Sequence, residues 1–119
     1  MMRSIKILAI VGMTTITLSL PVSAQNAEER ILKTEGQVSA INDADAARAA
    51  GENWTRTQLR LQEAKTAIDD RDEKIAKYRA HEASVQADIV QEKIKLAGLE
   101  RTADELQSSV NTLQRELSN

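Results

Sequence analysis

The sequence predicts an all-α protein, either an antiparallel helical hairpin or a three-helix bundle with a long C-terminal coiled-coil helix. Only 2% of the 119 residues are aromatic, whereas compact β-sandwich cores depend on large aromatic side chains for buried area. Four Gly and one Pro are too few for the turns of an all-β fold. Apolar residues also recur at helical spacing along about half of the chain.

The first 24 residues have the three-part pattern of a secretory signal peptide. Two basic residues precede an uncharged apolar run over residues 7–20, which is shorter than the ~20 residues of a membrane-spanning helix. Small side chains then suit cleavage after Ala24. We therefore expect a signal peptide, residues 1–24, and a helical or coiled-coil domain, residues 25–119, located in the bacterial periplasm without a membrane anchor.

A first helix is expected over residues 27–50. Ile31, Val38 and Ile41 mark one apolar face, and an alanine-rich run with high helix propensity follows. Gly51 comes directly after this run, where a C-terminal cap would lie.

A turn is expected at residues 51–54, with a second helix directly after it. Thr55 and Gln58 have the spacing of a capping box, in which each side chain bonds the backbone N–H of the other. Trp54 and Leu59 occupy the positions of a hydrophobic staple. The turn and cap residues are therefore Gly51, Trp54, Thr55 and Gln58.

Apolar residues from Leu61 onward follow alternating steps of three and four, the spacing of a coiled-coil stripe. This heptad stripe comprises Leu61, Ala64, Ile68, Arg71, Ile75, Tyr78, Glu82, Val85, Ile89, Glu92, Leu96, Leu99, Ala103, Leu106, Val110, Leu113 and Leu117. Its large aliphatic members are the expected helix-pairing residues. Its three charged members either lie at bundle ends and reach water or fix helix register and partner choice.

The residues leave open whether the chain turns again at residues 69–72. Asp70 and Glu73 fit a capping box, which favours a turn. No Gly or Pro is present there, however, and the heptad stripe continues in register. A turn gives a three-helix bundle, whereas an unbroken helix gives a hairpin whose second arm covers residues 56–117.

A family resemblance rests on residues 46–54 together with Leu59, Glu63, Ala64, Ala67 and Asp72. This set of residues resembles the domain-of-unknown-function 4398 family of bacterial envelope proteins. The resemblance covers about residues 40–100. It implies an alanine-rich helix, a short turn, a second helix and a turn near Asp70 into a third helix. At Arg71 this chain departs from the family, which tends to have Gly there. The resemblance implies no known activity.

No catalytic, metal or cofactor site is expected, because the chain has no Cys and a single His. His81 and Glu82 begin a zinc-protease motif, but Val85 stands where its second His would be. The acidic residues near Asp70 lack the glycine and the twelfth-position Glu of a calcium-binding loop. Loss of the signal peptide would change the net charge from −2 to −4, which argues against nucleic-acid binding.

The sequence therefore predicts a non-enzymatic periplasmic structural or interaction protein that acts through coiled-coil contacts between helices. Its C-terminal stripe extends beyond what the upstream helix can cover, so we expect a protein partner or self-association, most simply a homo-oligomer. The alternative function is a periplasmic holdase-type chaperone that grips unfolded proteins.

Overall fold

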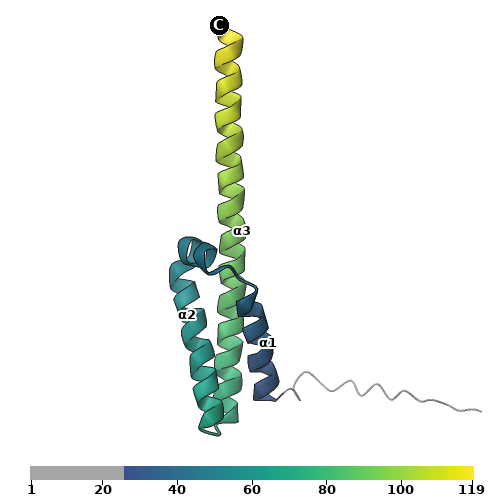
Figure 1. Ribbon diagram of the computed structural model, residues 1–119, viewed down its shortest axis with the longest axis vertical. Helices are drawn as coiled ribbons and strands as arrows, with labels where there is room; N and C mark the ends of the chain where they lie inside the picture. The colour runs from purple at the N-terminus through teal and green to yellow at the C-terminus, as the bar shows by residue number, and fades with distance from the viewer. Residues whose placement is uncertain (1–25) are drawn as a thin grey trace, which may run out of the picture.

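A computed structural model describes residues 26–119; the expected signal peptide, residues 1–24, lies outside the described residues. Three helices make up 91% of the described chain: α1 (Ala27–Ser39), α2 (Asp43–Asp69) and α3 (Glu73–Ser118). Figure 1 shows a three-helix bundle from which α3 continues far beyond the other two. The all-α prediction with a long C-terminal helix is confirmed.

The first helix is shorter than expected. Asn26 caps α1 by accepting a hydrogen bond from the Glu29 N–H at 2.8 Å, but α1 ends at Ser39. Asn42 then caps the next helix by accepting the Asp45 N–H at 3.0 Å. The predicted single helix over residues 27–50 is wrong, because an Asn at this position competes effectively as a helix cap.

The chain changes direction close to the predicted turn, but residues 51–58 are themselves helical, so the predicted turn residues and cap are wrong. The only non-helical residue within α2 is Ala50 (φ −151°, ψ 43°), so the change of direction takes one residue. Gly51 and Gln58 lie in the helix, and the Thr55 hydroxyl donates to the Gly51 carbonyl at 3.0 Å. Thr55 is therefore an interior helical residue with its hydroxyl bonded one turn back.

Trp54 is buried in the bundle, about one helical turn after the bend at Ala50. Trp54 is 6% exposed and packs with Ile41, Ala87 and Val90. Its indole N–H donates to Asp43 Oδ1 at 2.7 Å, so the first turn of α2 folds back over the ring. Leu59 is 51% exposed, which excludes the predicted staple.

The chain does turn between α2 and α3, so the hairpin with one continuous second arm is wrong. Arg71 has φ 61°, the left-handed conformation that commonly ends a helix. The Asp72 N–H bonds the Ala67 carbonyl at 2.8 Å. The Asp72 side chain, and not the expected Asp70, caps α3 by accepting the Ile75 N–H at 3.1 Å.

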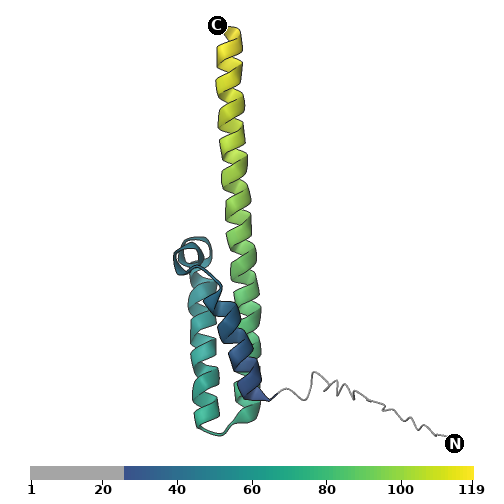
Figure 2. The ribbon, with the colours of Figure 1, turned by 45° about the vertical axis from the view of Figure 1, so that its right-hand side comes forward.

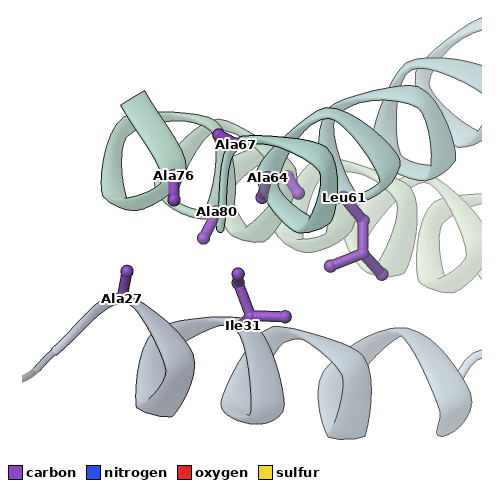
Figure 3. Close-up of a cluster of buried hydrophobic side chains, with 8 residues drawn as sticks. Ala27, Ile31, Leu61, Ala64, Ala67, Ala76 and Ala80 are labelled. Carbon is purple, nitrogen blue, oxygen red and sulfur yellow. The ribbon is translucent and has the colours of Figure 1, made fainter. Parts of the chain in front are cut away.

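α2 runs antiparallel to the first half of α3, and α1 packs mainly on α3 (Figure 2). Figure 3 shows the core near the turn, where alanines of α2 and α3 face Ala27 and Ile31 of α1. A second core cluster surrounds Trp54. Among residues 26–119, no helix is both long and apolar enough to cross a membrane.

Candidate functional site

The face of α3 that packs into the bundle carries small side chains. Four alanines along it are at most 1% exposed, and Val90 continues the same face with no exposed area. Small residues allow the backbones of α2 and α3 to approach closely, but they bury little apolar area. The inward residues of α3 are Ala76, Ala80, Ala83, Ala87 and Val90.

The opposite face of α3 carries large apolar side chains that nothing in the bundle covers. Nine of them are 42–87% exposed, and all nine occupy heptad-stripe positions. At ~100° per residue the two faces lie roughly 150° apart around the helix axis. We call these nine residues the exposed stripe: Ile75, Tyr78, Val85, Leu96, Leu99, Leu106, Val110, Leu113 and Leu117.

The exposed stripe extends along nearly the whole helix. Ile75 and Leu117 are separated by about 63 Å at ~1.5 Å per residue. Within residues 26–119, none after Val90 is buried, so the last part of α3 has its apolar side chains in water. Monomeric soluble proteins rarely expose contiguous apolar surface on this scale, and such surfaces mark interaction sites.

The heptad stripe predicted from the sequence is divided between two roles. Leu61 is buried and Ile68 is half-buried against the bundle core, so the α2 portion packs within the chain. In α3 the stripe is exposed, except that Glu82 and Ile89 are half-buried. The expected residues do not form one continuous surface, because the turn at Arg71 separates them.

Glu82 interrupts the stripe because it belongs to an ion-pair cluster that joins α2 to α3. Arg79 Nη1 donates to Glu82 Oε2 at 2.6 Å, and Arg79 Nε lies 3.2 Å from Glu63 Oε2. Arg60 contacts Glu63 at 2.8 Å and Glu82 at 3.5 Å. The hydrogen bond that Arg79 donates to Glu82 is the main cause that raises the pKa of Arg79. The cluster therefore keeps Glu82 turned toward its own chain.

The other two interruptions differ from Glu82. Glu92 is exposed and pairs only with Lys95 on the same helix, at 3.2 Å. Arg71 lies in the turn and not on a helix face. Glu92 is therefore the charged residue that a partner on the exposed stripe would meet directly.

The residues considered for chemistry serve structural roles or face water. Asp72 caps α3, and Glu73 accepts a hydrogen bond from the Ala27 N–H at 3.4 Å. His81 is exposed. Across residues 26–119, no three His, Cys, Asp or Glu side chains are grouped so that they could hold a metal ion.

The surface hollows are shallow and do not gather reactive groups. One lies between α1 and α2 and is lined by Leu32, Lys65 and Ile68, among others. Another lies on the exposed stripe, where Ile89 and Leu96 form its apolar wall.

The alanine face of α3 is the main feature that the sequence analysis missed. Ala76, Ala80, Ala83 and Ala87 repeat at steps of four, three and four, which is itself a helical pattern. The larger aliphatic residues on the other face gave a stronger signal. No family model, curated protein or solved structure matches the chain.

Proposed function

We propose that this protein is a non-enzymatic interaction protein of the bacterial periplasm, which binds a partner helix through the exposed stripe of α3. The observation that supports this function is the placement of apolar residues on α3, where the small ones are buried and the large ones face water. A protein stable only as a monomer would place the large residues inside.

The spacing of the stripe favours a helical partner over an unfolded client. Apolar residues at alternating steps of three and four form knobs and holes that match another helix. Each half-exposed Leu or Val covered by a partner contributes on the order of 1 kcal/mol. Polar residues flank the stripe, as in the solvent-facing positions of coiled coils.

The periplasmic location depends on the signal-peptide pattern of residues 1–24. We expect the mature protein recovered from the periplasm to begin at Gln25. N-terminal sequencing of the purified protein checks this, and a mature chain that still begins at Met1 in the cytoplasm would contradict it.

Photo-crosslinking in living cells tests the interaction function. A photoreactive residue replaces Leu106 on the exposed stripe or, as a control, Ser108 on the other side of the same exposed helix. We expect one or a few discrete products from position 106 and none from position 108. Many products of varied size from position 106 would indicate a holdase-type chaperone, and equal labelling from both positions would contradict a specific stripe.

A further inference from the structure

We propose that the occupant of the exposed stripe is α3 of a second copy of this chain, in the antiparallel direction. This inference rests on the proposed function, because it names the partner of the same surface. In this arrangement the two helices cross the symmetry axis between Ala97 and Gly98, and Val85 of each chain faces Val110 of the other.

The length of the stripe selects a partner of equal length. Exposed apolar residues continue from the bundle to Leu117, so a short segment would leave most of them in water. Two antiparallel α3 helices centred at residues 97–98 overlap over residues 78–117, about 60 Å. The apolar layers are then Tyr78–Leu117, Val85–Val110, Ile89–Leu106 and Leu96–Leu99, each formed twice.

The bundle leaves room for this partner. α1 and α2 contact the alanine face of α3 and its flanks, whereas the exposed stripe lies on the other side. In the antiparallel dimer the two bundles lie at opposite ends, so each bundle meets only the C-terminal part of the other α3.

The charged stripe residues favour the antiparallel direction. A parallel, in-register dimer places Glu82 against Glu82 and Glu92 against Glu92, and like charges at facing positions are unfavourable. The antiparallel dimer places Glu92 against Ala103, the smallest heptad-stripe side chain of α3. It places Glu82, held by Arg60 and Arg79 of its own chain, against Leu113.

The flanking charges select the register. In the proposed alignment, Lys93 of each chain lies beside Glu100 of the other. A shift of one heptad in one direction brings Glu100 beside Glu100, and Asp88 beside Glu116. A shift in the other direction brings Lys93 beside Lys93, and Lys95 beside Lys95. Of these three alignments, only the proposed one brings oppositely charged residues together without also bringing residues of like charge together.

Disulfide trapping tests the direction and the register. The chain has no Cys, so Val85→Cys and Val110→Cys each introduce a single thiol. Val85 is 42% exposed and Val110 is 45% exposed, so the bundle does not depend on either side chain. We expect a disulfide-linked dimer when the two full-length mature variants are mixed and oxidised, and none when either is oxidised alone.

The other outcomes overturn the proposal. Efficient disulfides within each variant alone would show a parallel dimer. Absence of crosslinks in the mixture, with a monomer in sedimentation at about 100 μM, would exclude a second copy as the partner. In that case discrete crosslinks from position 106 to a different protein would leave the proposed function intact.

A charge exchange provides an independent check. Glu100→Lys places a lysine at position 100 beside Lys93 of the other chain, and this occurs at two symmetric places in the dimer. We therefore expect the affinity of the dimer to fall on the order of tenfold. Adding Lys93→Glu restores opposite charges and therefore the affinity. In a parallel dimer Lys93→Glu would instead face Asp88, so failure of the double variant to recover in sedimentation overturns the antiparallel register.

Discussion

The two halves of α3 have similar helical geometry but different environments. In residues 73–94, one face is buried by α1 and α2, and its contacts are made chiefly by alanines. In residues 95–118 no residue is buried, although every heptad-stripe position is apolar. The first half is supported by its own chain, whereas the apolar side chains of the second half face water.

The two faces of α3 differ in side-chain size and in the apolar area that they can bury. The alanine face lets α1 and α2 pack closely but buries little apolar area, so it determines which helices pack within the chain. The stripe supplies area at regular spacing, which suits association between chains. Changes in side-chain volume should therefore affect the two halves in opposite ways.

The largest expected effect is loss of Trp54 from the bundle. Trp54→Ala removes a side chain that is 6% exposed and should lower the free energy of unfolding by about 3–5 kcal/mol. Urea unfolding followed by far-ultraviolet circular dichroism measures this change. The control is Tyr78→Ala on the exposed stripe, which should change the unfolding of the monomer by less than about 0.5 kcal/mol; a similar loss in both variants would refute the comparison.

The same substitution in the two halves gives the next largest contrast. Ala83→Leu inserts volume where the residue has no exposed area, and should destabilise the bundle by about 1–3 kcal/mol. Ala103→Leu, at a solvent-exposed position of the heptad stripe, should leave the bundle unchanged and strengthen self-association. Thermal unfolding and sedimentation measure the two effects, and destabilisation by Ala103→Leu would show that the tail packs on its own bundle.

Helix capping gives a smaller effect that is confined to the bundle. Asn42→Ala removes the side chain that accepts the Asp45 N–H, and should cost about 1 kcal/mol. Thr55→Ala should cost less than about 0.5 kcal/mol, because Thr55 lies inside α2 and bonds only the Gly51 carbonyl. Urea titrations of both variants compare the losses in the free energy of unfolding. A larger loss for Thr55→Ala than for Asn42→Ala would indicate that Thr55 is a helix cap after all.

The smallest expected effect is a gain in stability at the turn. Arg71 has φ 61°, and Gly adopts this conformation without the steric cost of a Cβ. Arg71→Gly should therefore stabilise the bundle by about 0.5–1 kcal/mol and raise Tm by a few degrees. Arg71→Ala is the control and should give no gain, since Ala retains the Cβ.

The sequence identified the helices by periodicity, but it did not identify what each face contacts. The spacing from Leu61 to Leu117 correctly indicated helix on both sides of the turn. It could not show that Leu61 packs within the chain while Leu106 faces water, because periodicity groups residues on a face without naming the partner. The residues alone left a turn at residues 69–72 open, and the structure has the turn there, between Asp69 and Glu73.

The errors at residues 39–58 have a local cause, the Asn42 cap, and a tertiary cause. Two local patterns, the alanine run before Gly51 and the capping box at Thr55, suggested one long helix and then a turn. Burial of Trp54 and its bond to Asp43 instead favour an earlier break at residues 40–42 and a bend at Ala50. Long-range contacts of one large side chain thus outweighed local propensity.

The placement of the helix ends gives the protein a further property. Ala27 lies beside Glu73 at the start of α3, and Asn119 lies 46 residues further along the same helix. The two ends of the described chain are thus held about 70 Å apart by one continuous rod. Fluorophores attached at these ends would report bending or melting of α3 as a change in energy transfer. The distance between the two ends therefore measures whether α3 stays helical along its whole length.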